Sequence, residues 1–382
     1  MAMDRLFQLM KEKNASDMFF AVNSPVHIKI NGNLIPINQQ KLEPDNITAL
    51  LAEIASPAQM EELERTNELN MGISVPKLGR FRLSAFRQRG SISAVFRFVP
   101  ANIPPLAELG LPPILAELIM EKRGLLLLVG ATGSGKSTTI ASMLDHRNEL
   151  RAGHILTLED PIEYLFKNKK SIVNQREIGS DADSFGTALR NSMRQAPDCI
   201  LIGEIRDKET MAAALAYAQS GHLVLATLHA NNSYNALNRI ISFYPIENRA
   251  ALLQDLSSAV KAIVSQRLVR AAAGGMRQAA VEVMVNTRYV ADLIEKGEIG
   301  QIKEAMEKSL SPGSQTFEGA LLQLVHGGLV SQEEALANAD SATNLLWLLN
   351  NGAEKGPKKD PEPDLSRSAD EGPSFTEFTL NT

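Results

Sequence analysis

The stretch VGATGSGKSTT, from Val129 to Thr139, is the feature that most constrains how this chain folds. It follows the apolar run from Leu125 to Val129 directly, and it satisfies the pattern GxxxxGK[ST] from Gly130 to Ser137. Glycine-rich loops of this kind turn successive backbone N–H groups inward around phosphate groups and open directly into a helix. The pattern therefore predicts a buried strand, a phosphate-binding loop and a helix, the start of an α/β nucleotide-binding domain.

The residues of this loop predict how ATP and Mg²⁺ would be held. The amine of Lys136 would reach the β- and γ-phosphate oxygens, and the hydroxyl of Ser137 would contact Mg²⁺. The nucleotide-binding residues predicted here are Thr132, Gly133, Ser134, Gly135, Lys136, Ser137 and Thr138.

Short apolar runs follow the loop in alternation with segments of helical pattern. The runs LLLLV, HILTLE, CILIGE and HLVLATLH predict a parallel sheet covered by helices on both faces. From about Asn248 the chain is expected to be helical. One helix should stop at Gly327-Gly328, and a capping box of Ser331 with Glu334 should open the next.

The N-terminal part has a strand pattern of a different kind. Residues alternate from Ser16 to Pro36 around the hairpin signal Asn31-Gly32, and a second β pair is predicted from Gly79 to Val99. Between them, DNITALLAEIASPAQMEELERT predicts two helices separated at Ser56-Pro57. This predicts a small α+β domain at 1–99.

The remaining boundaries follow from proline and charge. Five prolines in the fifteen residues VPANIPPLAELGLPP predict a semi-rigid linker at 100–112. The larger domain is then expected at 113–350. The segment 351–382 is rich in proline and charge and poor in apolar residues, which predicts a disordered acidic tail.

Composition excludes several classes of protein. A net charge of −5, dispersed Lys and Arg and only 5% aromatic residues argue against a nucleic-acid-binding protein. The single cysteine, Cys199, excludes an intramolecular disulfide or a site of several thiolates. Because the start lacks a signal-peptide core and no run of about 18 apolar residues occurs, we expect a cytoplasmic protein without a transmembrane segment.

Hydrolysis of a bound nucleotide would require acidic residues at the ends of neighbouring strands. HILTLEDPIEY carries Glu159, Asp160 and Glu163 just past one predicted strand end. DCILIGEIRD carries Glu204 directly after another strand, in the position of a Walker B acid that contacts Mg²⁺ through water. Each of these carboxylates could instead cap a helix or remain solvated.

Histidines and arginines provide further candidates. His222 and His229 lie at opposite ends of one predicted strand, so both cannot contact the same phosphate. His229, at the carboxyl end where open α/β sheets bind ligands, is the better candidate for sensing the γ-phosphate. Of the arginines in GRFRLSAFRQRGSISAVFRFV, Arg82 and Arg97 lie within the paired strands and could meet the charge that develops on the γ-phosphate, whereas those near the turn are interpreted as solvated.

In these motifs the chain resembles the type IV pilus retraction ATPases of the PilT/PilU group, within the secretion ATPase superfamily. The motifs occur in the order of that group: Walker A GATGSGKST, Asp box TLEDPIEY, Walker B ILIGEIRD and His box SGHLVLATLH. The resemblance extends to about Asn350. It implies a PAS-like N-terminal domain, a RecA-like P-loop NTPase domain with a helical C-terminal region, and a homo-oligomeric ring of six subunits.

The resemblance also implies roles for single residues. Glu163 falls on the general base for the attacking water and Glu204 on the Walker B acid, while Arg82 and Arg97 fall on arginines that approach the nucleotide from the N-terminal domain. Hydrolysis would move domains as rigid pairs and power pilus retraction and twitching motility. The implied partners are a PilT-type retraction ATPase and the platform protein of the inner-membrane pilus base, where the protein would lie peripherally.

One departure from the family pattern favours the PilU branch, an accessory retraction motor. PilT-type motors carry the motif AIRNLI, and the aligned stretch from Tyr289 to Ile294 reads YVADLI, with Ala291 and Asp292 in place of arginine and asparagine. The acidic tail favours the same branch.

Three alternatives stay open at this point. A pilus-assembly or type II secretion ATPase would typically carry a four-cysteine zinc module, which one cysteine cannot supply. A nucleotide-gated structural subunit would not need the full set of carboxylates. A RecA-like DNA translocase is disfavoured by the acidic balance.

Overall fold

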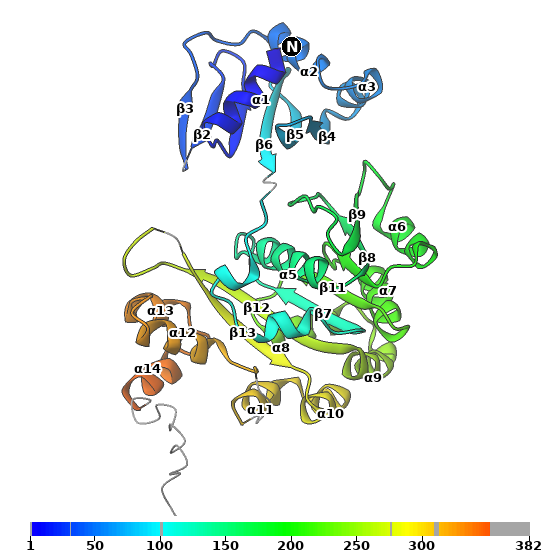
Figure 1. Cartoon of the computed structure of the whole chain (residues 1–382), viewed down its shortest axis with the longest axis vertical. Coiled ribbons are helices and arrows are strands. Elements are labelled where there is room, and N and C mark those ends of the chain that lie inside the picture. The colour runs from blue at the N-terminus through cyan, green and yellow to red at the C-terminus, as the bar shows by residue number, and fades with distance from the viewer. Residues whose placement is uncertain (1, 31, 100–101, 276, 309–312, 352–382) are drawn as a thin grey trace, which may run out of the picture.

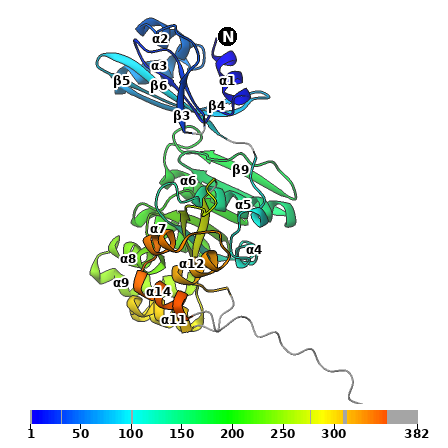
Figure 2. The same cartoon turned by 90° about the vertical axis from the view of Figure 1, so that its left-hand side faces the viewer.

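The computed structural model describes residues 2–30, 32–99, 102–275, 277–308 and 313–351 of the chain. Its strands form two sheets that lie in separate bodies (Figure 1). In both views the N-terminal body sits above the end of the larger body that carries strand β9 and helix α6 (Figure 2). Among the described residues, no helix has the length and apolar character needed to span a membrane.

The N-terminal body is an antiparallel sheet with three helices. The strand order is β3-β2-β1-β6-β5-β4. The strands are β1 (Asp17–Phe20), β2 (His27–Ile30), β3 (Asn33–Pro36), β4 (Glu68–Val75), β5 (Gly79–Gln88) and β6 (Ser91–Val99). The helices are α1 (Ala2–Glu12), α2 (Pro44–Ala52) and α3 (Pro57–Thr66).

Local sequence explains most of these elements. The predicted hairpin is confirmed, since β2 and β3 pair with Ile30 opposite Asn33 and Gly32 has a φ of +85°; Asn31 itself lies outside the described residues. The predicted β5–β6 pair and both predicted helices are also confirmed. Helix α3 starts at a capping box in which Ser56 accepts from the Gln59 N–H and the Gln59 side chain accepts from the Ser56 N–H.

Helix α1 and strand β4 were not predicted, although their patterns are regular. Met3, Phe7 and Met10 recur at helical spacing and are fully buried under the sheet. The Phe7 ring stacks on Phe81 with centroids 4.2 Å apart. Strand β4 pairs along its whole length with β5, which places Gly72 opposite Arg82.

The larger body is built on a seven-stranded sheet of order β13-β12-β7-β11-β10-β8-β9. Neighbouring strands are parallel except for the edge pair β12–β13. Its strands are β7 (Gly124–Val129), β8 (Gly153–Glu159), β9 (Ser171–Glu177), β10 (Cys199–Ile202), β11 (Leu223–Leu228), β12 (Val260–Val269) and β13 (Gln278–Val285).

Helices cover both faces of this sheet, as predicted. Side chains of β7 alternate between two cores: Leu125, Leu127 and Val129 enter one, Leu126 and Leu128 the other. The first core is covered by α6 (Phe185–Ser192), α7 (Lys208–Gln219), α8 (Ser233–Ser242), α9 (Arg249–Ala259), α10 (Arg288–Lys296) and α11 (Ile302–Lys308), and the second by α4 (Ile114–Leu118) and α5 (Lys136–Leu150).

The prediction of a helical chain from Asn248 onward was wrong for Val260 to Val285. This segment forms β12 and β13, and β12 pairs with the interior strand β7. The turn between the two strands contains Gly274 and Gly275, both with positive φ. Pairing with β7 decides the conformation, because the sequence of β12 also carries apolar residues at helical spacing.

Three helices complete the described chain: α12 (Phe317–His326), α13 (Gln332–Asn338) and α14 (Ala342–Asn351). The predicted stop at Gly327 is confirmed. Ser331 does cap α13 by accepting from the Glu334 N–H, but the Glu334 carboxylate accepts from the N–H of Arg270 at 3.1 Å, so we find half of the predicted box. Helix α14 lies in the region that was expected to be helical, although no start or end was predicted for it, and it carries the only tryptophan of the chain, Trp347, at 61% exposure.

Part of the predicted linker and most of the predicted tail lie outside the described residues. Residues 100–101 lie outside the described residues, and a single 3-10 turn, Leu106–Glu108, follows them. Residues 352–382 also lie outside, while Asn351 still belongs to α14.

Candidate nucleotide site

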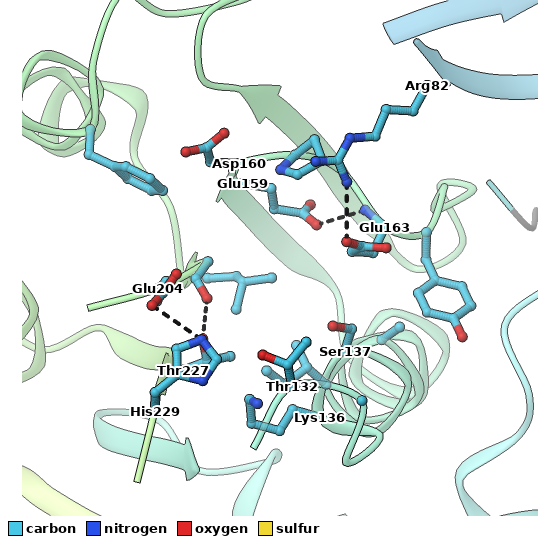
Figure 3. A pocket seen from close by; sticks show the side chains of 18 of the residues that line it. Arg82, Thr132, Lys136, Ser137, Glu159, Asp160, Glu163, Glu204, Thr227 and His229 are labelled. Atoms are coloured by element: carbon cyan, nitrogen blue, oxygen red, sulfur yellow. Dashed lines mark hydrogen bonds and ion pairs between the residues drawn. The ribbon is translucent and has the colours of Figure 1, made fainter. Parts of the chain in front are cut away.

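A cavity of about 340 Å³ opens beside the start of α5 and the carboxyl ends of β8, β10 and β11. One residue of the N-terminal body, Arg82 of β5, reaches into its wall (Figure 3). Among the residues that line the cavity are Thr132, Gly133, Lys136, Ser137, Glu159, Asp160, Glu163, Tyr164, Glu204, Thr227 and His229. The predicted Walker A loop, Asp box, Walker B acid and His box therefore meet at one place.

The phosphate loop depends on glycines that adopt positive φ. Gly130, Gly133 and Gly135 have φ values of +152°, +78° and +90°. Gly135 is the N-cap of α5, so the helix begins at Lys136 and its N-terminus points into the cavity. A Cβ at Gly133 would meet nothing within 4 Å, which leaves room for a ligand beside the loop.

Lys136 is held by its own loop. Its Nζ donates to the carbonyl oxygens of Gly130 at 2.7 Å and Ala131 at 2.9 Å. Burial lowers the pKa of Lys136, and the nearby Glu204 carboxylate partly opposes that shift. An amine bound to neutral carbonyls in a desolvated site gains when a phosphate anion takes their place.

The other predicted loop residues lie in different surroundings. The Ser137 hydroxyl is exposed toward the cavity and Thr132 lines it, whereas Gly135 and Thr138 do not. The Thr138 hydroxyl pairs instead with the Tyr164 hydroxyl at 2.8 Å. Ser134 is buried, and its hydroxyl finds no hydrogen-bond partner within the described parts of the chain.

Glu204 follows β10 and contacts the side chains of Arg206 and His229. Its Oε2 accepts from Arg206 Nε at 2.8 Å, and its Oε1 lies 3.4 Å from His229 Nε2 (Figure 3). Arg206 also lies 3.4 Å from Asp160, and its hydrogen bond with Glu204 raises the pKa of its guanidinium. His222 lies at the far end of β11 beside Tyr217, as the strand pattern predicted.

Two glutamates after β8 differ in environment. Glu159 is buried, and this burial raises the pKa of its carboxyl although Thr157 and Gln175 donate hydrogen bonds to it. Glu163 is 48% exposed at the side chain, and its Oε1 lies 3.8 Å from Arg82 Nη1. Glu163 is thus placed where it could accept a proton from a water molecule in the cavity.

Arg97 is not among the residues that line the cavity. It lies opposite Arg82 in the β5–β6 pair, but its Nε donates to Asp17 Oδ1 at 2.8 Å on the neighbouring strand. Its side chain remains 60% exposed.

The donor set fits a nucleoside triphosphate with Mg²⁺. Lys136, the loop N–H groups and the N-terminus of α5 supply positive charge for phosphates, while the Ser137 hydroxyl and the Glu204 carboxylate are oxygen ligands of the kind Mg²⁺ prefers. Sequence reasoning missed Arg206 and Tyr164. Tyr164 lies in the Asp box TLEDPIEY and Arg206 in the Walker B motif ILIGEIRD. The acidic residues on either side of Arg206 could have indicated that it pairs with a carboxylate of the site.

Comparisons with known proteins agree with this geometry. The family model described as "Type II/IV secretion system protein" matches residues 2–312. The type IV pilus ATPase PilU of Pseudomonas aeruginosa is 46% identical over 354 residues, which cover 93% of either chain. The type IV pilus retraction ATPase PilT of the same organism is 38% identical, over 90% of this chain and 100% of its own.

Solved structures show the same relationship. The crystal structure of the pilus retraction motor PilT with bound ADP matches with a TM-score of 0.83 and 38% identity, over 88% of this chain and 96% of that one. The family match at residues 2–312 includes both the N-terminal sheet and the sheet that bears the cavity. The chain belongs to the type II/IV secretion system protein family and, within it, to the PilT/PilU-type ATPases.

Proposed function

We propose that this protein is a PilU-type motor that hydrolyses ATP to power or assist type IV pilus retraction, and with it twitching motility. The observation that carries the proposal is the cavity in which Lys136, Glu204 and Glu163 meet Arg82 from the other body. The 46% identity to PilU over 93% of the chain supports the biological role.

The residues divide the work of hydrolysis. Lys136 and the loop N–H groups bind the β- and γ-phosphates, and the Ser137 hydroxyl and the Glu204 carboxylate would hold Mg²⁺. Bound Mg²⁺ would neutralise charge on the phosphate oxygens. Glu163 orients the attacking water and accepts its proton, and Arg82 stabilises the charge that develops on the γ-phosphate. His229, 3.4 Å from Glu204, senses the γ-phosphate through that carboxylate.

Arg97 has a second, conditional role in this proposal. For its side chain to reach the nucleotide it would have to leave Asp17, and its 60% exposure leaves room for that movement.

The proposed domains are a PAS-like unit at 1–99, a linker at 100–112, a RecA-like unit at 113–350 and an acidic tail at 351–382. The ring is a hexamer at the cytoplasmic side of the inner membrane, in contact with the pilus platform protein.

The accessory role rests on the surface of α10. In the stretch from Tyr289 to Ile294, Val290, Leu293 and Ile294 are buried, whereas Asp292 is exposed and Ala291 is partly so. The arginine and asparagine positions of the PilT-type motif, which are Ala291 and Asp292 here, therefore lie at the surface, where a partner would be contacted. This favours a motor that acts together with a PilT-type ATPase.

Phosphate release from Mg·ATP by the full chain, alone and with the PilT-type motor, tests the proposal. Glu163→Gln should lower turnover by about 10²-fold or more because the general base is lost, with ADP affinity retained. Glu149→Gln removes a carboxylate that is 64% exposed on α5 and serves as the matched control. Wild-type turnover in Glu163→Gln, or no turnover in the unaltered protein under either condition, would refute the proposal.

A further inference from the structure

Strand β5 sends two arginines to the larger body, and they differ sharply in burial. Arg80 and Arg82 are two residues apart and therefore lie on one face of the strand. Arg82 forms a loose pair, 3.8 Å from Glu163, with side chains 38% and 48% exposed. Arg80 Nη2 lies 2.9 Å from Glu177 Oε2, with side chains only 16% and 7% exposed. Because its side chains are nearly buried, the attraction between Arg80 and Glu177 is screened by solvent much less than that between Arg82 and Glu163.

Glu177 connects this pair to the loop after β8 that carries Glu163. It is the last residue of β9 and lies beside Glu159 in the β8–β9 register. The same Oε2 that meets Arg80 also accepts a hydrogen bond from the Ile162 N–H at 3.0 Å. One buried oxygen thus joins the N-terminal body to the Pro161–Ile162 peptide, one residue before Glu163.

The loop is held from two sides by carboxylates. Ile162 is bound by Glu177, and the next N–H, that of Glu163, donates to Glu159 Oε2 at a longer 3.5 Å. Ile162 is itself 4% exposed, so its position is set by packing as well. The direction in which the Glu163 side chain leaves this loop therefore depends on Glu177 keeping its place.

Strand β4 makes room for the Arg80 side chain. A Cβ added at Gly72 would lie 2.7 Å from Arg80 Cζ, and closer still to Nη2. Gly72 does not need to be glycine for its backbone, because it has no positive φ. The missing side chain at this position is what lets the guanidinium cross β4 toward Glu177.

We propose that Arg80 is a positioning residue for hydrolysis: its pair with Glu177 docks the N-terminal sheet on the end of β9 and fixes the Pro161–Ile162 peptide next to Glu163, so that Glu163 and Arg82 face the cavity together. This inference rests on the proposed ATPase function. Arg80 touches neither phosphate nor water in this scheme, and it acts through Glu177.

Steady-state ATP hydrolysis by the full chain, with the PilT-type motor where turnover requires it, tests the role of Arg80. Arg80→Gln should lower kcat about tenfold or more, because a small displacement of a general base is costly, while KM changes less than about threefold. Glu177→Gln keeps an oxygen for the Ile162 N–H but loses the charge that pairs with Arg80. It should therefore lower kcat by about the same factor as Arg80→Gln. Arg80→Lys should recover most of the loss, because one nitrogen makes the contact.

Three further variants separate positioning from general damage. The double variant Arg80→Gln/Glu177→Gln should be no slower than either single variant within about twofold, since both remove one interaction. Gly72→Ala should push the guanidinium away from Glu177 and lower kcat as Arg80→Gln does, yet have no effect in the Arg80→Gln background. Arg87→Gln, at an exposed position on the same strand, should behave like wild type.

The outcomes are decisive in either direction. Unchanged kcat in Arg80→Gln, additive losses in the double variant, or a Gly72→Ala protein as fast as wild type would each overturn the inference. If Arg80→Gln does not fold, Gly72→Ala and Arg80→Lys decide the question, because both keep the charge. A Glu163→Gln protein that hydrolyses normally would refute the proposed function itself, whereas inactive Glu163→Gln beside normal Arg80→Gln would refute only the positioning role.

Discussion

Replacing Asp340 is expected to loosen the last two helices of the described chain. Asp340 connects α13 to α14, and its side chain is 13% exposed although its backbone is open to solvent. Its Oδ2 accepts from Asn232 Nδ2 at 2.9 Å and from the Tyr234 hydroxyl at 2.8 Å, and its Oδ1 pairs with Arg267. The first two donors lie at the start of α8, three and five residues beyond His229, so one carboxylate ties the C-terminal helices to the segment after the His box.

The expected size of the effect follows from these contacts. The bonds from the two neutral donors, Asn232 and Tyr234, contribute about 1 kcal/mol each and the bond from the charged donor Arg267 about 2 kcal/mol, so Asp340→Ala should cost about 4 kcal/mol of local stability. At about 1.4 kcal/mol per factor of ten, this is about a thousandfold increase in local opening. Asp340→Asn keeps an oxygen for the neutral donors but loses the charge, so it should cost about 2 kcal/mol, or about thirtyfold.

Hydrogen–deuterium exchange of the full chain, read by mass spectrometry on peptides from α13 and α14, measures this opening directly. Glu333→Gln removes an exposed carboxylate from α13 and should change exchange by less than about 0.5 kcal/mol. The expected order of exchange rates is Asp340→Ala, then Asp340→Asn, then wild type. Wild-type protection in Asp340→Ala would show that these three donors do not hold the helices.

The same contacts predict a pH dependence. Burial by itself raises the pKa of Asp340, but the hydrogen bonds from Arg267, Asn232 and Tyr234 outweigh it, so the folded pKa lies below its ordinary value. A depressed pKa contributes stability that is present above the unfolded value of about 3.9 and is lost as pH falls through the folded pKa. Protection of α14, corrected for intrinsic exchange, should therefore hold down to about pH 5 and fall only below about pH 4. Asp340→Asn should lack that fall.

Three other perturbations test separate parts of the molecule. Phe81→Ala removes a fully buried ring that stacks on Phe7 and should cost about 3–5 kcal/mol, seen as a lower unfolding temperature of the N-terminal body; a loss below about 1 kcal/mol would contradict the packing. Gly203→Ala would bring a Cβ within 3.0 Å of the Leu158 carbonyl oxygen, beside Glu204. The kcat for ATP hydrolysis should therefore fall while the unfolding temperature of the N-terminal body stays unchanged, and normal turnover would refute this expected clash. Burial raises the pKa of Cys199 to about 12, so a thiol reagent near pH 8 should label the folded protein far more slowly than the urea-unfolded protein, and equal rates would show that Cys199 is accessible.

The parts of the fold that sequence predicted are those with local signals. The phosphate loop, the hairpin at Gly32 and the cap at Ser331 each depend on a few adjacent residues. The strands β7, β8, β10 and β11 were predicted because they are buried on both faces and therefore read as unbroken apolar runs. The meeting of four motifs at one cavity followed from the rule that ligands bind at the carboxyl ends of parallel strands.

The parts that sequence did not predict depend on tertiary pairing. β12 alternates too weakly to exclude a helix, and only its place beside β7 selects the strand. β9 is an edge strand whose exposed positions include Ile172 at 59%, so neither alternation nor an apolar run marks it. For the site, the Arg80–Glu177 pair joins residues 97 positions apart on two sheets, and no local pattern contains that information.

The single tryptophan on α14 makes the C-terminal helices observable without any label. Trp347 is 61% exposed in a chain with no second indole, so its emission reports one place at the end of the molecule away from the N-terminal sheet (Figure 2). A partner that covered this helix would move the indole from water into an apolar contact and shift its emission to the blue. Mixing the protein with candidate subunits in a fluorimeter would thus reveal contact at this end while leaving the nucleotide site untouched.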